Sequence, residues 1–308
     1  MGRRLEAFRG VLETAVARRG VALMGVCNVT PDSFSDGGRY LGVDAARARV
    51  QELLEEGADL VDIGGESTRP GAKPVPVAEQ LSRILDVVRF AAGRGACVSV
   101  DTASPEVAAA SLDAGACVVN DVSCLRDPDL ARVAAGSGAA LLLMHSRPGQ
   151  DAMPGFSQYP DDGYGDVVDD VIREWEEAAT RAVQLGMTRD ALVMDPGLGF
   201  SKNARHSLEL LARTAEIRAH LAGPSRPVPL AIGASRKSFL AVVDRNAPPT
   251  SRIGASIMAA VHATQAGASI VRVHDVRATA QAVDLARRLA VSGAASPPLR
   301  AVFAGKGP

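Results

Sequence analysis

Hydrogen-bonding side chains recur at the ends of short apolar runs along this sequence. Asp101, Asn120 and Asp195 each stand at the end of such a run, where a parallel β-sheet would bring all three to one edge. One such residue alone is well explained as a helix N-cap. Three acceptor-bearing groups that converge instead favour a pocket for a polar, planar ligand.

Basic side chains take the corresponding positions later in the chain. Lys237 lies in the segment Ser235-Arg236-Lys237-Ser238-Phe239, which follows an apolar run, and Arg272 and His274 lie at the end of the last run. Because side chains two residues apart share one face of a strand, Arg272 and His274 point the same way. A cationic pair at a strand end suits a phosphate group better than it suits ordinary surface ion pairing.

Two segments rich in glycine and hydroxyl groups add to this anion chemistry. Residues 64–71 read Gly-Gly-Glu-Ser-Thr-Arg-Pro-Gly, in which glycines free backbone N–H groups beside hydroxyls and a guanidinium, as a pyrophosphate site requires. Residues 28–38, from Asn28 to Gly38, are rich in side-chain oxygens and fit a loop that closes over a ligand. Turn chemistry and a cap for the helix near Asp44 explain the second segment equally well.

Several familiar motifs are absent. Gly197-Leu198-Gly199 does not extend to a dinucleotide fingerprint, since the later glycine position is Lys202, and no Walker lysine pattern follows. The five histidines form no zinc-binding pair, so zinc chemistry is not indicated. A magnesium ion held by oxygen ligands remains compatible with the sequence.

A strand-then-helix unit repeats eight times without an intervening linker, which predicts an α/β fold, a (β/α)8 TIM barrel in a single domain, with an open doubly wound sheet as the alternative. The expected ranges are residues 1–20 for a helical leader, 21–291 for the barrel and 292–308 for a flexible tail. The predicted strands are Val21–Val26, Leu60–Ile63, Cys97–Val100, Cys117–Asn120, Ala140–Met144, Leu192–Met194, Pro229–Ile232 and Ile270–Val273. The predicted helices are Asp44–Glu56, Val77–Ala92, Pro105–Ala114, Asp129–Ala135, Gly165–Leu185, His206–Leu221, Ile253–Gln265 and Ala278–Leu289.

Composition narrows the class of protein further. The 308 residues hold 34 Lys plus Arg against 35 Asp plus Glu, a formal net charge of -1, which argues against a nucleic-acid or anionic-membrane partner. The charged N-terminus has no apolar signal-peptide region, so we expect a cytoplasmic protein. Four cysteines, none in a C-x-x-C pair, predict buried or partly buried free thiols.

The strand-end strings, taken together and in order, resemble the dihydropteroate synthase family from about Leu23 to Leu289. The matching segments are Asn28 to Gly38, Gly64 to Gly71, Ser99 to Thr102, Asn120 to Val122, Met144-His145, Asp195 to Phe200, Ser235 to Phe239 and Arg272 to Val276. The resemblance implies the same barrel and a transferase of folate biosynthesis. Its implied reaction joins 6-hydroxymethyl-7,8-dihydropterin pyrophosphate to p-aminobenzoate and releases pyrophosphate and 7,8-dihydropteroate.

The resemblance also implies roles for particular residues. The pterin pocket is Asp101, Asn120, Met144, Asp195, Phe200, Lys237 and Arg272, with the Arg272 guanidinium stacked on the ring. Pyrophosphate is held by Asn28, Thr68, Arg272 and His274, and Mg²⁺ by Asn28 and Asp36. The p-aminobenzoate slot is Phe34, Pro70, Lys237 and Ser238, under loops 30–38 and 67–71 that close over the site. Asp101, Lys237 and Asp36 are the expected catalytic residues, acting in a dissociative substitution.

Two other functions stay open at this point. A methyltetrahydrofolate-dependent methyltransferase shares the pterin-binding barrel but gives no reason for the segments at 67–71 and 235–239, and a non-catalytic pterin-binding paralogue would lack turnover. The family further implies a homodimer, for which Ile253 to Ala263 is a candidate interface. Cys124, Ser146 and Ser207 depart from the family's usual residues, which affects only the details of loop packing.

Overall fold

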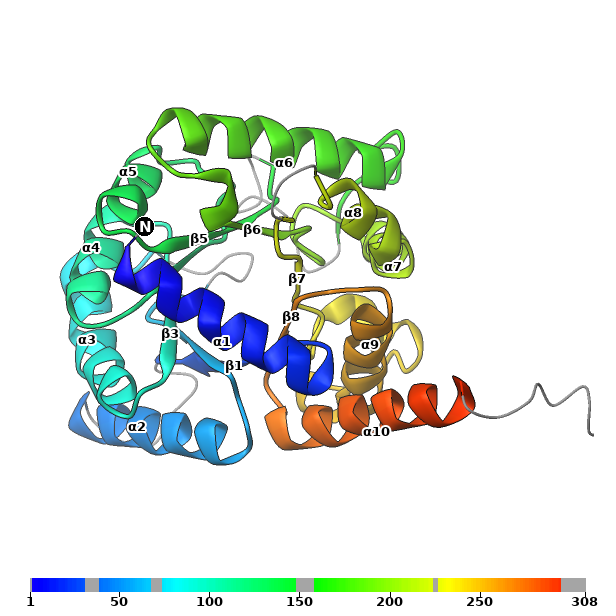
Figure 1. The fold of residues 1–308 in the computed structure, drawn as a ribbon, viewed down its shortest axis with the longest axis horizontal. Coiled ribbons are helices and arrows are strands. Elements are labelled where there is room, and N and C mark those ends of the chain that lie inside the picture. The colour runs from blue at the N-terminus through cyan, green and yellow to red at the C-terminus, as the bar shows by residue number, and fades with distance from the viewer. Residues whose placement is uncertain (1, 31–38, 68–73, 148–157, 224–226, 295–308) are drawn as a thin grey trace, which may run out of the picture.

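The computed structural model describes residues 2–30, 39–67, 74–147, 158–223 and 227–294. Within them, eight parallel strands lie in the order β6-β5-β4-β3-β2-β1-β8-β7, and a bridge between Met194 and Leu230 joins the two ends of this series. The strands are β1 Ala22–Asn28, β2 Leu60–Gly64, β3 Cys97–Asp101, β4 Val118–Asp121, β5 Ala140–Met144, β6 Leu192–Asp195, β7 Ala231–Ile232 and β8 Ile270–Val273. The predicted (β/α)8 barrel is therefore confirmed (Figure 1).

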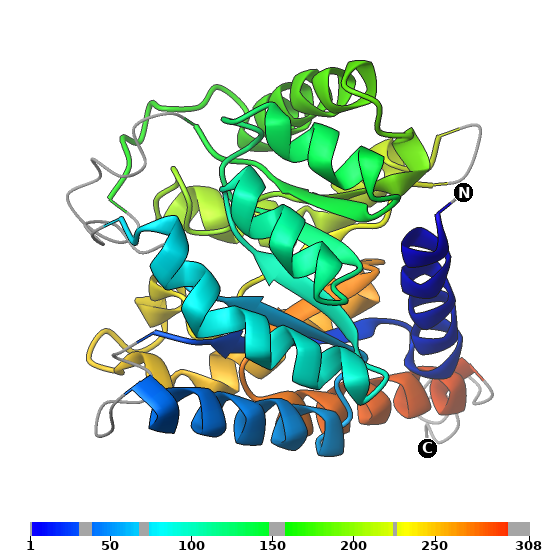
Figure 2. The same cartoon turned by 90° about the vertical axis from the view of Figure 1, so that its left-hand side faces the viewer.

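Helices surround this ring of strands, as both views show (Figures 1 and 2). Their burial pattern explains the arrangement: on α6, for example, Val171, Trp175 and Ala178 are buried against the strands while charged residues face outward. The described α-helices are α1 Arg3–Arg19, α2 Arg39–Glu55, α3 Val77–Gly93, α4 Pro105–Asp113, α5 Asp129–Gly136, α6 Val167–Gln184, α7 Ala204–Ala212, α8 Thr214–His220, α9 Ile253–Gln265 and α10 Val276–Ala294.

Several elements differ from the sequence-based prediction. Helix α2, for example, begins at Arg39 and not at the predicted Asp44. The strand predicted from Pro229 is only Ala231–Ile232, because a proline at 229 has no N–H to give to a ladder. The helix predicted over residues 206–221 is instead the two helices α7 and α8. At the junction between them, the Thr214 hydroxyl donates to the carbonyls of Leu210 and Leu211. Helix α10 continues to Ala294, three residues into the segment predicted as the tail.

Helix α1 lies across the end of the barrel where the strands begin (Figure 1). The Arg4 guanidinium donates to the carbonyls of Ser137 and Leu112, and the Leu5 amide donates to Gly138, all in the connections that lead into β4 and β5. Because α1 covers this end, the strand-end side chains predicted to bind ligand lie at the opposite mouth.

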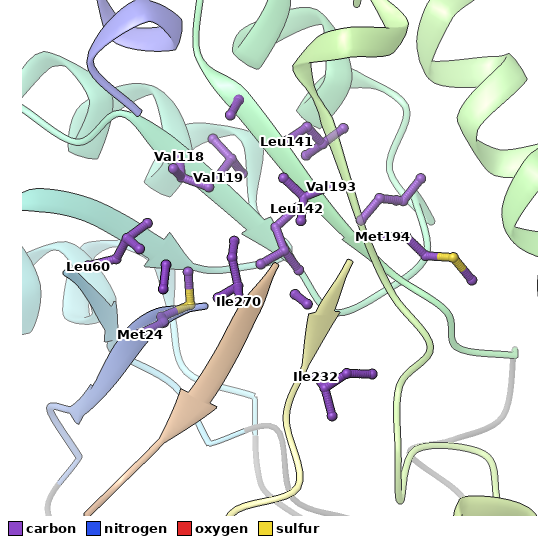
Figure 3. Packing of buried hydrophobic residues seen from close by; sticks show 14 of the residues in the cluster. Met24, Leu60, Val118, Val119, Leu141, Leu142, Val193, Met194, Ile232 and Ile270 are labelled. Carbon is purple, nitrogen blue, oxygen red and sulfur yellow. The ribbon is translucent and has the colours of Figure 1, made fainter. Parts of the chain in front are cut away.

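The barrel interior is filled by apolar side chains from neighbouring strands. Met24, Leu60, Leu142 and Ile270 are at most 1% exposed and gather inside the ring (Figure 3). Packing of this kind stabilises a side chain by roughly 1.5–3 kcal/mol on burial. The interior is thus a packed core, and ligand chemistry is confined to the mouth.

The four cysteines are free, as predicted: Cys27, Cys97 and Cys117 are buried and Cys124 is partly buried. Cys124 adopts a φ of 60°, in the left-handed region that favours glycine. Along the described ranges, no helix combines the length and apolar character that crossing a lipid bilayer would need.

Candidate active site

Strand register brings the predicted acceptors to a common level. Asn28 pairs with Gly64, Gly64 with Asp101, and Asp101 with Asn120 across β1 to β4, while Met144 pairs with Asp195 across β5 and β6. Each pair stands at the carboxyl end of its strands. The convergence expected from the sequence is therefore present.

Arg272 is the electrostatic centre of this mouth. Its Nε donates to Asp62 Oδ2 at 2.6 Å and its Nη2 donates to Asp101 Oδ2 at 2.8 Å. Asp62 Oδ2 also accepts from Asn120 Nδ2 at 3.0 Å, so one carboxylate ties Arg272 to Asn120. The second oxygens of Asp62 and Asp101 are buried and find no hydrogen-bond partner among the residues described. Buried acceptors are normally satisfied, so these two oxygens require a donor that the described residues do not supply.

Lys237 and Asp195 lie close enough at this mouth to influence each other electrostatically. Lys237 Nζ donates to the carbonyl of Leu198 and lies 4.4 Å from the centre of the Phe200 ring, a cation–π contact. Asp195 Oδ1 accepts from the Gly197 amide at 2.7 Å. Met144 is 2% exposed and forms apolar wall beside Asp195.

The predicted phosphate residues lie next to this group. His274 Nδ1 is 3.0 Å from the Ser235 hydroxyl, which also accepts from the His274 amide at 3.2 Å. Burial, with repulsion from Arg272 and Arg236, lowers the pKa of His274 to about 3. His274 therefore offers a neutral imidazole at pH 7, and the fixed positive charge beside it comes from Arg272.

Burial governs the protonation of the other polar groups. It raises the pKa of Asp101 to about 7 against the opposing effect of Arg272, and it raises the pKa of Asp195. Burial lowers the pKa of Lys237 to about 8, with Asp195 acting in the opposite direction. Titratable groups with such shifted pKa values, gathered at a strand-end mouth, are typical of functional sites.

The structure thus brings together Asp101, Asn120, Asp195, Lys237 and Arg272, with Met144 and Phe200 as wall, Asn28 and His274 alongside, and Ser238 directly after Lys237 at the start of a short 3-10 helix. The predicted residues Phe34, Asp36, Thr68 and Pro70, and most of loops 30–38 and 67–71, lie outside the described residues. The arrangement can bind a planar heterocycle by hydrogen bonds along one edge and an anion beside it.

A magnesium ion fits the donor chemistry at this place. Asn28 ends β1 level with Gly64, and a Cβ built on Gly64 would lie 3.7 Å from Asn28 Oδ1 and 3.3 Å from Asp101 Cβ. An amide oxygen is the kind of hard ligand that Mg²⁺ prefers, whereas Asp36, the other predicted ligand, lies outside the described residues. No cluster of three His, Cys, Asp or Glu side chains suited to a metal occurs among the described residues.

Sequence reasoning missed Asp62, which is fully buried and holds both Arg272 and Asn120. The available signal was a single charge inside the apolar run Leu60-Val61-Asp62-Ile63. A buried carboxylate needs a partner, so this position predicts a cation opposite it. Lys202, to which the sequence analysis assigned no role in binding, is also fully buried.

Comparison with known proteins agrees with this geometry. The family model for pterin binding enzymes matches residues 24–274. A dihydropteroate synthase of Escherichia coli is 40% identical over 262 residues, covering 85% of this chain and 89% of the relative. A probable bifunctional folylpolyglutamate synthase/dihydropteroate synthase of Haloferax volcanii is 42% identical over 267 residues, of which this chain spans 30% of the length.

Solved structures give the same result. A Xanthomonas albilineans dihydropteroate synthase with 4-aminobenzoic acid superimposes with a TM-score of 0.79 at 39% identity, covering 90% of this chain and 94% of that one. A Burkholderia cenocepacia dihydropteroate synthase complexed with 7,8-dihydropteroate has a TM-score of 0.79 at 36% identity with the same coverage.

The barrel, its polar mouth and the match to the family model place this chain among the pterin binding enzymes. Within that class the chain belongs to the dihydropteroate synthase family, whose members are transferases.

Proposed function

We propose that this protein joins 6-hydroxymethyl-7,8-dihydropterin pyrophosphate to p-aminobenzoate, giving 7,8-dihydropteroate and pyrophosphate in folate biosynthesis. The observation that carries the proposal is the pair of buried, unpartnered carboxylate oxygens of Asp62 and Asp101 beside Asn120, Asp195 and Lys237. The pterin's N–H edge donates to carboxylates, and Lys237 donates to ring acceptors. Each hydrogen bond to a charged group contributes about 1.5–3 kcal/mol.

The bond that breaks joins carbon to the pyrophosphate oxygen next to an electron-rich ring, so the substitution proceeds dissociatively through a ring-stabilised cation. Asp101, held by Arg272 at 2.8 Å, places negative charge where positive charge develops. Arg272 and His274 orient the pyrophosphate, together with Asn28 and Thr68. Asn28 and Asp36 would hold a Mg²⁺ ion, which would supply charge neutralisation of the leaving group.

A pyrophosphate-release assay tests this reaction. We expect release to require the dihydropterin pyrophosphate, p-aminobenzoate and Mg²⁺ together, with 7,8-dihydropteroate formed in equal amount. Absence of release by an enzyme that still binds 6-hydroxymethylpterin would favour the methyltransferase or the non-catalytic paralogue instead.

Pterin affinity is expected to fall as the pH is lowered from 8 to 6. The pKa of Asp101 is raised to about 7, so acidification protonates a carboxyl that must accept hydrogen bonds from the ligand. Below this pKa the affinity falls up to about tenfold per pH unit. Calorimetric titration with 6-hydroxymethylpterin measures the profile, and the Asp101→Asn variant should lose most of the dependence. An equally steep profile in that variant would assign the titration to another group.

The p-aminobenzoate slot is proposed at Phe34, Pro70, Lys237 and Ser238, closed by loops 30–38 and 67–71. Sulfonamides mimic p-aminobenzoate, so Phe34→Ala and Pro70→Ala should each raise the sulfonamide inhibition constant by about tenfold or more, because each removes at least one methylene-scale contact from the slot. Val243→Ala, which alters a side chain that is 76% exposed, serves as the control. Unchanged inhibition in both slot variants would refute the assignment.

A homodimer is proposed through the outer faces of α9 and α10, which pack together on one side of the barrel (Figure 1). Met258, Leu285 and Leu289 are 57–63% exposed there, and Ile253 is 39% exposed. Clustered exposed apolar side chains mark interaction surfaces. Sedimentation velocity should show a dimer that Met258→Glu combined with Leu289→Glu converts to a monomer, and a wild-type monomer at micromolar concentration would contradict it.

The predicted cytoplasmic location stays a prediction.

A further inference from the structure

Lys202 is a completely buried lysine that the reaction described above does not use. It lies two residues after Phe200, and its Nζ donates to the Phe200 carbonyl at 3.0 Å and lies 2.9 Å from His145 Nδ1. The Tyr164 ring centre is 5.9 Å from the same nitrogen. Burial lowers the pKa of Lys202 to about 7. The contacts of its nitrogen with Phe200 and His145 offset the cost of burying this polar group.

His145 connects Lys202 to a helix outside the barrel. Burial, with the nearby Lys202, lowers the pKa of His145 to about 4, so its ring is neutral at pH 7. With Lys202 donating to Nδ1, the proton lies on Nε2 and is donated to Glu174 Oε2 at 3.0 Å. Glu174 of α6 is in turn paired with Arg147, at 2.6 Å. The loop after β6 is thereby fixed to α6 through an unbroken series of polar contacts.

That loop, residues 196–201, carries two groups that shape the pterin site. Its Leu198 carbonyl accepts from Lys237 Nζ, and its Phe200 ring lies against the same ammonium. Its Gly197 amide donates to Asp195, and a Cβ at Gly197, whose φ is +68°, would lie only 2.1 Å from the His145 carbonyl oxygen. The loop therefore packs directly on His145 while it orients Lys237 and Asp195.

A second side chain holds the same loop from helix α7. Ser207 Oγ accepts from the Gly199 amide at 3.0 Å and donates to the Asn203 carbonyl at 2.8 Å. This contact supports the backbone of the loop, whereas Lys202 bonds the carbonyl of the residue whose ring forms pocket wall. Removing the Lys202 ammonium would leave the Phe200 carbonyl and His145 Nδ1 without that donor.

We propose that Lys202 is a positioning residue of the pterin site, which fixes the 196–201 loop through Phe200 and His145 so that the Phe200 wall and Asp195 meet the ring. The proposal rests on the proposed function, since it assigns pterin binding to this mouth. Lys202 itself does not touch the substrate. Because Phe200 and Asp195 are assigned to the pterin, and neither is assigned to the p-aminobenzoate slot, the effect is expected chiefly on the binding of the pterin.

The test compares Lys202→Met, which keeps the length without a donor, with Lys202→Gln, which keeps a donor for the Phe200 carbonyl. We expect Lys202→Met to weaken 6-hydroxymethylpterin binding and raise KM for the dihydropterin pyrophosphate by about tenfold. The KM for p-aminobenzoate and kcat at saturation should change less than about twofold, and Lys202→Gln should recover part of the affinity. The control for general destabilisation is Leu112→Ala. This substitution creates a cavity beside α4, near the end of the barrel that α1 covers.

The outcomes separate the two proposals. Wild-type protein that binds no pterin would overturn the proposed function and this inference with it. Wild-type protein that binds pterin, with Lys202→Met binding it equally well, would overturn the positioning role alone. A Lys202→Met variant with a lower kcat and a higher KM for both substrates, in the same pattern as Leu112→Ala, would also overturn the positioning role. That pattern would show that Lys202 contributes only to the stability of the protein.

Discussion

The Asp101→Asn variant is expected to release pyrophosphate about 10²–10³-fold more slowly than the wild type. Asparagine keeps the shape and one acceptor oxygen but lacks the charge that faces the developing cation. It can also present an NH₂ group to Arg272, itself a donor, where the wild type has a carboxylate oxygen at 2.8 Å. The measurement is kcat and KM for both substrates under saturating Mg²⁺.

The matched control is Asp169→Asn, the same change at an exposed carboxylate in the first turn of α6. It should leave kcat unchanged. If Asp101→Asn keeps more than half of the wild-type kcat, Asp101 is not a catalytic residue. Among the expected catalytic residues that the structure describes, Lys237 would then remain.

Asp62→Ala is expected to lower the free energy of unfolding by about 3 kcal/mol. Asp62 is fully buried and accepts from Arg272 at 2.6 Å and from Asn120 at 3.0 Å, so its removal leaves a guanidinium short of one counter-charge and an amide short of one acceptor. Urea unfolding followed by circular dichroism measures the change. Pterin binding should weaken as well, since Arg272 and Asn120 both lose a fixed partner.

An exposed ion pair provides the comparison. Asp86→Ala removes the partner of Arg89 on α3, where both side chains are more than half exposed, and should cost less than about 1 kcal/mol. Equal effects of the two substitutions would mean that the Arg272 cluster contributes nothing beyond surface electrostatics.

The sequence alone predicted the barrel because the strands are short, mainly apolar runs with polar residues at or just after the ends of most of them. Ala140–Met144 and Ile270–Val273 were placed to the residue, and Asp101, Asn120 and Asp195 were placed at strand ends. These features are local, since a doubly covered parallel strand must be apolar along its length. Residue pattern is sufficient to locate them.

The contacts among the site residues could not be predicted in the same way. Arg272 was expected to stack on a ring and hold pyrophosphate, and its pairing with Asp62, 210 residues away in the chain, follows only from closure of the barrel. Asp62 was missed because polar residues were sought after the strands and not within them. The roles of Lys202 and His145 depend on rotamers in a packed interior, which spacing does not reveal.

The backbone pairing between neighbouring strands is not equally extensive around the barrel. Between β6 and β7, the link is the bridge of Met194 with Leu230, where Met194 N donates to the Pro229 carbonyl at 2.9 Å, beside a β7 of only two residues. Asp195 ends the first of these strands and Lys237 follows the second. A heterocycle that donates to Asp195 and accepts from Lys237 would link the end of β6 to the segment that follows β7. Ligand binding would then stabilise the barrel between these two strands, where the backbone pairing is sparsest.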